Sequence, residues 1–397
     1  MRRVVFAAWL LSAAYVPASA QVAGPRGDPD LDYWYDVFYP KLFYAGREGL
    51  LAGAYFALVQ PLRSRNFDSP PPYRISISLD GQASTSGSRF LKLEGRAPGL
   101  ANGWRFSARL TARRRAKDNY FGIGNATLFD SDSVTDAQPN FYRAVRTQYV
   151  ARTELQRVLV GPLRALAGLN IERWKLAPRT GPSVFATDLT IDPSIGVPTN
   201  EFSARVGLVF DTRDDEVASG RGVLIEAIWG VADSSVAGDL SYTRTTLSAR
   251  GFLTPSPRLQ LGARVVGQMM GGSPGVGSLY LIEGSGRFYE GIGGGETHRA
   301  LLDNRLLGRD KLFANIDVRY ALFAIPTLYR VSLLGFFDAG RVFDVAESQD
   351  FEVTTNGLKV GAGSGLFFQI GRAGIAGFTV GVGPDGIASD FHIKWTF

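Results

Sequence analysis

The sequence has no cysteine, only two histidines and no long apolar run that could cross a membrane as a helix. Without cysteine the chain can form neither a disulfide scaffold nor a thiolate metal site, and the absence suits an oxidising compartment. A spanning helix needs roughly 18 to 20 apolar residues, which excludes a helical membrane protein. Hydrophobic residues nevertheless make up 45% of the chain and aromatic residues 12%, so their spacing carries the information.

The N-terminus has the features of a secretory signal peptide. Arg2 and Arg3 precede a short apolar run, and the small residues Ala-Ser-Ala at 18–20 form a cleavage site. The alternative, a membrane anchor, would need a longer run. We therefore expect three parts, which are a signal peptide at 1–20, a short periplasmic segment at 21–37 without a periplasmic domain, and one main domain at 38–397.

The charge balance excludes another class. Without the signal peptide the chain has 41 basic and 37 acidic residues, a net charge of +4. Such a small excess argues against a dedicated nucleic-acid binder. The positions of the arginines along the chain are therefore more informative about function than the net charge.

Apolar and polar residues alternate along many short segments. In "GWRFSARLTARRR" Arg105 and Arg109 lie on one face and apolar residues on the other, as in a two-faced strand. The C-terminal "SDFHIKWTF" repeats the pattern, with Trp395 and Phe397 on its apolar face. A globular core could not bury the arginines, and no amphipathic helix is available to cover the apolar faces. A barrel with lipid outside and water inside satisfies both faces.

The alternation predicts an all-β fold, a transmembrane antiparallel β-barrel of about sixteen strands, the last at 388–397. An even number is expected for a single-chain barrel of the Gram-negative outer membrane. All long connections fall on one side of the predicted barrel, which would be extracellular. These connections are 115–142, 177–199, 271–310 and 343–355.

Three segments are more specific than a generic barrel. They are the turn "FDTRDDEVASGRG", the loop "GIGGGETHRALLDNRLLGRD" and the strand "LLGFFDAGRVFD". With these the chain resembles the BamA/TamA-type outer-membrane superfamily, the bacterial surface-antigen barrels, in a short form without POTRA domains. The matching residues are Asp211, Arg213, Asp214 and Gly222 in the periplasmic turn, Gly293, Gly294, Gly295 and Arg299 in the loop, and Asp338 and Gly340 in the strand.

The resemblance implies that the sixth extracellular loop folds back into the barrel lumen. By alternation Asp317 and Asp338 face the lumen, and a planar guanidinium can bridge two carboxylates. We therefore expect Arg299 within roughly 4 Å of Asp338 or Asp317. Ala300 and Leu301 stand where the family has glycine and an aromatic residue.

Two functions remain open. The resemblance implies translocation or assembly of proteins or lipids at the outer membrane, with a separate periplasmic partner. The alternative is a passive or gated pore that prefers anions, because several arginines are predicted to line the lumen. Those arginines are Arg74, Arg105, Arg109, Arg244 and Arg250.

The C-terminus suggests a further partner. The final Trp395 and Phe397 resemble the signal that the barrel-assembly machinery reads during biogenesis, and the predicted apolar outer face would contact membrane lipids. We expect no enzyme, cofactor or metal site. His298 and His392 lie in no nucleophile elbow, catalytic triad or metal-spaced acidic cluster.

Overall fold

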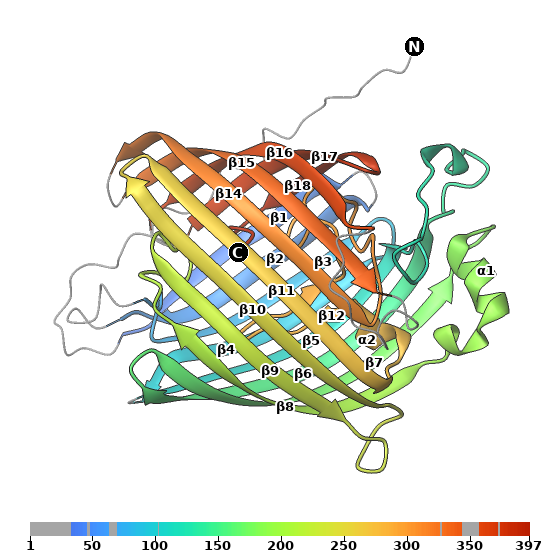
Figure 1. Ribbon diagram of the computed structural model, residues 1–397, viewed down its shortest axis with the longest axis horizontal. Helices are drawn as coiled ribbons and strands as arrows, with labels where there is room; N and C mark the ends of the chain where they lie inside the picture. The colour runs from blue at the N-terminus through green and yellow to red at the C-terminus, as the bar shows by residue number, and fades with distance from the viewer. Residues whose placement is uncertain are drawn as a thin grey trace.

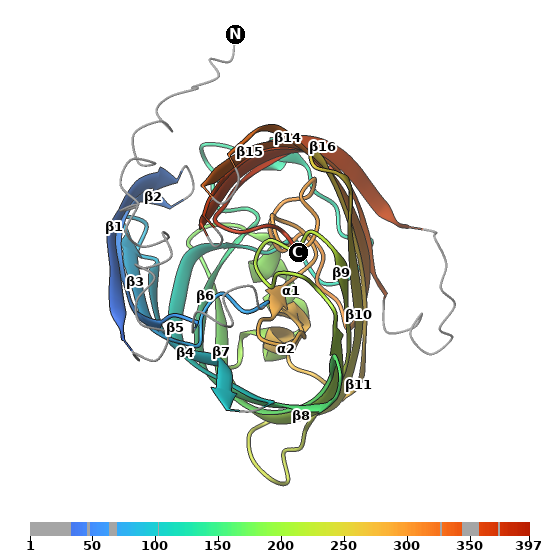
Figure 2. The same ribbon diagram turned by 90° about the vertical axis from the view of Figure 1, so that its left-hand side faces the viewer.

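The computed structural model describes residues 33–45, 48–62, 70–101, 103–325, 328–343, 357–371 and 374–397. The predicted signal peptide and residues 21–32 lie outside these ranges. In the described part sixteen strands form one antiparallel sheet that curls around a lumen (Figures 1 and 2), which confirms the predicted number. Each strand pairs with the next one along the chain, except that β11 pairs with β14 across the longest connection.

The barrel strands have the following bounds: β1 Tyr35–Ala45, β2 Gly49–Gln60, β3 Ile75–Ser84, β4 Arg89–Ala101, β5 Trp104–Asn119, β6 Arg143–Val160, β7 Leu163–Pro178, β8 Thr199–Asp211, β9 Gly222–Ala232, β10 Ser241–Ser256, β11 Leu259–Ser273, β14 Asp310–Ile325, β15 Tyr329–Phe343, β16 Lys359–Ile370, β17 Gly374–Gly383 and β18 Gly386–His392. The shorter elements are η3 Ser131–Ser133, α1 Val184–Ile191, η4 Pro193–Gly196, α2 Val276–Tyr280, β12 Leu281–Ile282 and β13 Tyr289–Glu290. The first strand begins at Tyr35, three residues before the predicted boundary at 38.

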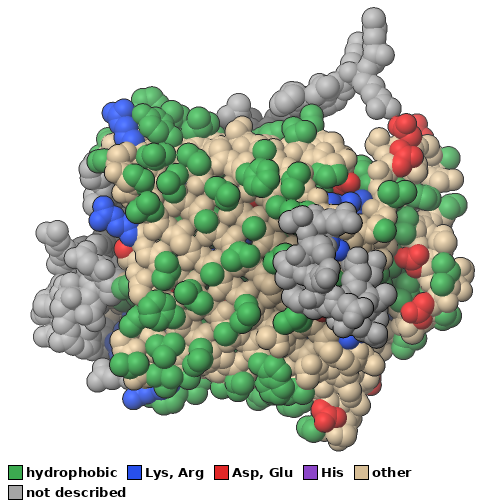
Figure 3. Space-filling view, viewed as in Figure 1, with side chains coloured by type: hydrophobic (Ala, Val, Ile, Leu, Met, Phe, Trp, Pro, Cys, Tyr) green, Lys and Arg blue, Asp and Glu red, His purple; other side chains and the backbone are tan. Residues whose placement is uncertain are grey.

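Burial alternates along the strands as the sequence predicts. In β6, Arg146 and Arg152 face the lumen and are buried, whereas Tyr149 and Leu155 face outward and are 53% and 40% exposed. Hydrophobic side chains accordingly spread over the outer surface of the sheet (Figure 3). Hydrogen bonds between neighbouring strands satisfy the polar groups of the backbone, so the outer face can be apolar.

The two ends of the barrel differ. The connections from β5 to β6, β7 to β8, β11 to β14 and β15 to β16 all lie at one end, here called the long-loop end, because an odd number of strands precedes each of them. The other end, the short-turn end, carries the β4–β5, β6–β7 and β10–β11 turns. Part of the predicted long connection 343–355 lies outside the described residues. No helix in the described ranges is long and apolar enough to cross a membrane.

One prediction about the last strand is wrong. The alternation predicts a last strand over 388–397, but β18 ends at His392. The following residues turn into the lumen, where Trp395 and Phe397 are only 5% and 7% exposed; Figure 2 shows the C-terminus inside the barrel outline. The physical reason is a patch of buried apolar side chains on the inner wall, including Phe367, which the tail covers.

Candidate functional site: the lumenal loop and its anchors

The connection between β11 and β14, residues 274–309, lies inside the barrel and is here called the lumenal loop. It contains α2, β12 and β13, and Figure 2 shows it within the ring of strands. Its Ile282, Ile292 and Leu306 pack with Phe313 and Val342 of the wall in one buried cluster. Burial of these side chains holds the loop against the barrel.

Glycines shape the tip of the loop. Gly293 and Gly294 have φ values of +125° and +82°, which disfavour other residues. A Cβ on Gly293 would lie 2.1 Å from the Leu302 carbonyl oxygen, and one on Gly295 would lie 2.7 Å from the His392 ring. Only glycine fits these positions, so the tip can turn tightly against the wall.

Arg299 lies between two aspartates of the barrel wall. Its Nη1 is 2.7 Å from Asp317 Oδ1 on β14, and its Nη2 is 2.6 Å from Asp338 Oδ1 on β15. The Nε and backbone N–H of Arg299 also donate to Asp338 Oδ2, at 2.9 and 2.7 Å. The three side chains are fully buried. The structure thus brings together the loop arginine and both aspartates that the sequence singled out.

Neighbouring groups complete this network. Asn315 donates to Asp338 Oδ1 and to the Thr297 carbonyl oxygen, both at 2.7 Å. Arg319 Nη2 lies 2.8 Å from Asp317 Oδ2. The Arg299 guanidinium also lies 4.2 Å from the centre of the Phe336 ring, a cation–π distance. Each carboxylate therefore has two polar partners.

Burial and neighbouring charges shift the pKa values of two loop residues in opposite directions. Burial alone would lower the pKa of Arg299, but Asp317 and Asp338 raise it above its ordinary value. For the neighbouring His298, burial lowers the pKa by more than the charge of Asp338 raises it. Arg299 is thus held as a cation, and removing one of its aspartates would leave a buried charge poorly compensated.

Two glutamates provide further anchors for the lumenal loop. Glu290 Oε2 is 2.6 Å from Arg146 Nη2, and Glu290 Oε1 is 2.6 Å from Arg113 Nη1. Burial raises the pKa of Glu290, but the guanidiniums of Arg146, Arg113 and Arg115 hold it well below its usual range. Glu283 lies between Arg205, at 2.6 Å, and Arg152. Acids of the loop thus neutralise arginines of the wall.

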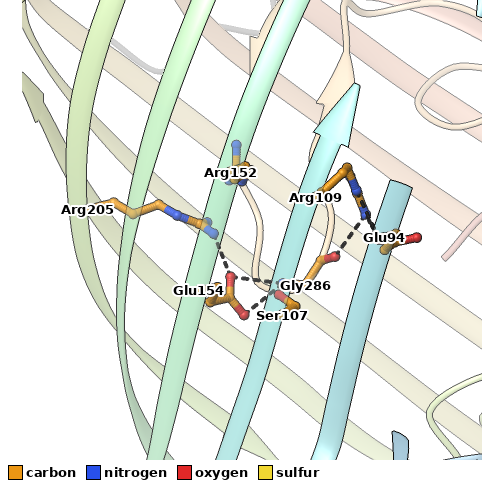
Figure 4. A pocket seen from close by; sticks show the side chains of 7 residues that line it. All are labelled: Glu94, Ser107, Arg109, Arg152, Glu154, Arg205 and Gly286. Carbon is orange, nitrogen blue, oxygen red and sulfur yellow. Dashed lines mark hydrogen bonds and ion pairs between the residues drawn. The ribbon is translucent and has the colours of Figure 1, made fainter. Parts of the chain in front are cut away.

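A small polar cavity lies between Gly286 of the loop and residues of β4, β5, β6 and β8 (Figure 4). Glu154 accepts a hydrogen bond from Arg205 at 2.7 Å and from the Gly286 N–H at 3.1 Å, and Arg109 Nε donates to Glu94 at 2.9 Å. The cavity holds about 10 Å³, room for about one water molecule. Loop and wall are therefore in close contact here.

Most of the arginines predicted to line a pore have acidic or carbonyl partners. Arg105 makes a bidentate pair with Glu216 at 2.7 and 2.8 Å. Arg250 pairs with Glu226 at 2.8 Å, and Arg244 donates to the Ser278 carbonyl oxygen at 3.1 Å. Arg109 has Glu94 as described above, and Arg74 is half-buried on the segment before β3. Their net positive field is therefore much smaller than the sequence suggested.

The turn between β8 and β9 also enters the lumen. Asp211 holds Arg213 by two hydrogen bonds of 2.9 and 3.0 Å, and Asp214 accepts from the Gly220 N–H at 2.8 Å. A Cβ on Gly222, at φ +97°, would lie 2.3 Å from the Thr212 carbonyl oxygen. The four residues singled out for this turn therefore shape it. Its middle part packs Val217 and Ala218 against the cluster that contains Trp395.

The two histidines lie beside oxygen atoms of the barrel wall. His298 Nε2 lies 3.0 Å from the Lys359 carbonyl oxygen, and His392 Nε2 lies 2.8 Å from Thr379 Oγ1. Within the described ranges no group of three or more histidine, aspartate or glutamate side chains could hold a metal ion.

Sequence reasoning missed the loop glutamates and the inward tail. Glu283 and Glu290 had a detectable signal, because arginines that face a lumen need counter-ions and these acids lie in the loop predicted to enter it. Arg319 lies two residues after Asp317 and so faces the lumen by the same alternation, but the sequence carries no signal for its contact with the Trp395 ring, at 4.0 Å. The tail itself still alternates, so periodicity could not show its turn inward.

A sixteen-stranded antiparallel barrel with an apolar outer face is of the outer-membrane class. In this barrel the buried Arg299 binds the longest described loop to the inner wall. Residues 76–386 match the model of the Omp85 superfamily domain, and the chain belongs to that superfamily. Its location is the Gram-negative outer membrane. A search of curated proteins finds no match.

Solved structures share the fold. The chain is similar to BamA from Haemophilus ducreyi lacking POTRA domains 1–3, with 14% identity, a TM-score of 0.53, and coverage of 91% of this chain and 69% of that one. It is also similar to CdiB from Escherichia coli, with 11% identity, a TM-score of 0.58, and coverage of 92% and 62%. Identities this low show the fold alone, and the chain spans only part of either protein.

Proposed function

We propose that this protein acts in translocation or assembly of proteins or lipids at the outer membrane, together with a separate periplasmic partner. The observation that carries the proposal is the lumenal loop, bound through Arg299 to Asp317 and Asp338 inside an Omp85-superfamily barrel. The likeness to BamA and CdiB supports the same class. We place the barrel among lipids, and propose that the barrel-assembly machinery inserts it and that it catalyses no reaction.

The alternative is the passive or gated anion-preferring pore. It is favoured by the inner faces of β1 and β4, which are half-exposed and carry cationic side chains. It is disfavoured by the glutamates that neutralise Arg105, Arg109 and Arg250, and by the loop that occupies the lumen. We therefore expect no steady anion-selective current from the resting protein.

Planar-bilayer conductance of the purified barrel separates the two functions. Assembly or translocation predicts little steady current from the wild type and a higher basal current from Arg299→Ala, because the loop loses its anchor. Photo-crosslinking from the short-turn end in cells should then recover a periplasmic protein. A steady anion-selective current from the wild type, with no crosslinked partner, would favour the pore.

A further inference from the structure

Four cationic side chains lie on the outer face of β4, β5 and β7 at the long-loop end. They are exposed, and they are in phase with the apolar side chains that face outward on the same strands. The four, here called the outer basic patch, are Arg89, Arg114, Arg173 and Lys175. No other strand in the described ranges carries an exposed lysine or arginine at this end. The patch is therefore confined to one side of the barrel.

The pairing register places these cations side by side. Arg89 lies directly opposite Arg114, and the same row continues through Thr147 of β6 to Lys175. Like charges that lie directly opposite each other on one face of a sheet are destabilising. The pair of Arg89 and Arg114 is therefore more stable when an anion lies between the two guanidiniums.

The part of the chain that the structure describes supplies no acid to this patch. Arg114 Nη1 donates to the Gly87 carbonyl oxygen at 2.6 Å, and Arg173 Nη1 donates to Asn200 Oδ1 at 3.0 Å, and both acceptors are neutral. No aspartate or glutamate faces outward on β4 to β7. Arginines on the inner faces of the same strands do pair with acids. A counter-charge for the patch therefore has to come from outside the described chain.

The outer basic patch borders an apolar surface. Two residues nearer the short-turn end, the outward-facing row is mixed and consists of Leu91, Ala112, Tyr149 and Arg173. The row after it is wholly apolar and consists of Leu93, Leu110, Ala151 and Ile171. Its three large side chains are 44% to 56% exposed. A cationic row above an apolar one fits a lipid, with an anionic headgroup above its acyl chains.

The four cations form two pairs. Arg89 and Arg114 lie on neighbouring strands, whereas Arg173 and Lys175 lie two residues apart on the same face of β7. Between the pairs β6 contributes Thr147, which is uncharged but can donate a hydrogen bond. Neighbouring strands lie about 4.8 Å apart, so about 10 Å separates β5 from β7. Each pair can hold one phosphate by charge-assisted hydrogen bonds.

We propose that the outer basic patch binds the headgroup of a bis-phosphorylated glycolipid of the outer leaflet, with one phosphate at each cation pair. The acyl chains then lie along the apolar row. A headgroup with a single phosphate fills only one pair, so affinity depends on the second phosphate. This inference goes beyond the proposed function, because it concerns a lipid held at the outer surface of the barrel.

The test measures lipid adducts of the intact, detergent-solubilised barrel by native mass spectrometry. The probes are lipid A with two phosphates, lipid A with one phosphate, and phosphatidylglycerol. For the wild type we expect an apparent Kd at least about tenfold lower for the two-phosphate lipid, because the other two lipids leave one cation pair without an anion. This comparison needs no variant. Equal affinity for the two forms of lipid A would overturn the proposal.

A pair of double variants locates the site. Arg89→Gln with Arg114→Gln removes one cation pair and leaves the apolar row intact. Arg221→Gln with Arg258→Gln is the matched control, because it removes two exposed arginines at the short-turn end. The first variant should bind the two-phosphate lipid about tenfold more weakly and should no longer distinguish it from the one-phosphate lipid. The control should bind as the wild type does. An equal loss in both variants would show attraction by net charge alone and would overturn the proposal.

Discussion

The inner wall of the barrel differs between β1–β4 and β14–β15. On β14 and β15 the inward-facing Asp317 and Asp338 are fully buried, because the lumenal loop covers them. On β1 the inward-facing Tyr39 and Lys41 remain half-buried. We call β14–β15 the covered wall and β1–β4 the open wall.

The two walls have the same strand pattern but different energetics. On β3 of the open wall and β14 of the covered wall, polar side chains face inward and apolar side chains outward, so the period of two does not distinguish the two walls. The two walls differ in how much water reaches their charged side chains. A charge on the covered wall loses its hydration and depends on its partners, whereas a charge on the open wall keeps much of its hydration. Coverage by the loop therefore decides how much each ion pair contributes.

The largest expected effect comes from breaking the central pair of the covered wall. Asp338→Ala removes three hydrogen bonds to Arg299 and leaves its guanidinium poorly compensated in a buried site. We expect a loss of about 3 to 5 kcal/mol in the stability of the docked loop. Limited proteolysis of the folded barrel should then cut within residues 274–309.

The control for this change is Val318→Ala, on β14 but facing outward and 44% exposed. It should leave the loop resistant to protease, because it touches the outer surface alone. If Asp338→Ala also stays resistant while the heat-modifiable band on a gel is unchanged, Arg299 does not anchor the loop.

A smaller effect is expected where the loop touches the β16 backbone. A Cβ on Gly361 would lie 2.3 Å from the Cβ of Ala300, which occupies the position next to Arg299. Gly361→Ala should therefore lift the loop tip and destabilise it by about 1 to 3 kcal/mol, as overpacking does. Gly335→Ala on β15 is the matched control, since a Cβ there meets nothing within 4 Å.

Spin labels at Leu302, in the loop, would measure this difference as nitroxide mobility. Gly361→Ala should increase that mobility and Gly335→Ala should not. Equal mobility in both variants would mean that β16 tolerates a methyl group at Gly361, opposite Ala300, and that contact with β16 does not fix the loop tip.

Much of the fold follows from the sequence because alternation reports directly on a two-sided environment. The sixteen strands and the side on which the long connections fall come from that pattern and from parity. The meeting of Arg299 with Asp317 and Asp338 could be proposed because strand parity fixes which acids face inward, and because the motif resembles a family in which the loop enters the lumen. Local pattern and topology agree here.

The tail shows where this reasoning ends. His392, Lys394 and Thr396 alternate with apolar residues as a strand would, yet strand pairing stops at His392. The deciding factor is an apolar patch on β15 and β16, distant in sequence, whose burial outweighs continued pairing. No pattern within the last ten residues contains that information.

The smallest effect is expected on the open wall. Lys41 Nζ lies 2.6 Å from Asp80 Oδ1, a shorter distance than several contacts of the covered wall, and it also lies 5.8 Å from the centre of the Tyr39 ring. Both charged groups retain access to water, with 17% and 15% of their side chains exposed. Lys41→Ala should therefore cost only about 0 to 1 kcal/mol, and high salt should reduce even that. A double-mutant cycle with Asp80→Ala, read from the temperature at which the folded gel band disappears, measures the pair itself. A coupling as large as the effect of Asp338→Ala would mean that distance, rather than coverage by the loop, sets the strength of ion pairs on this inner wall.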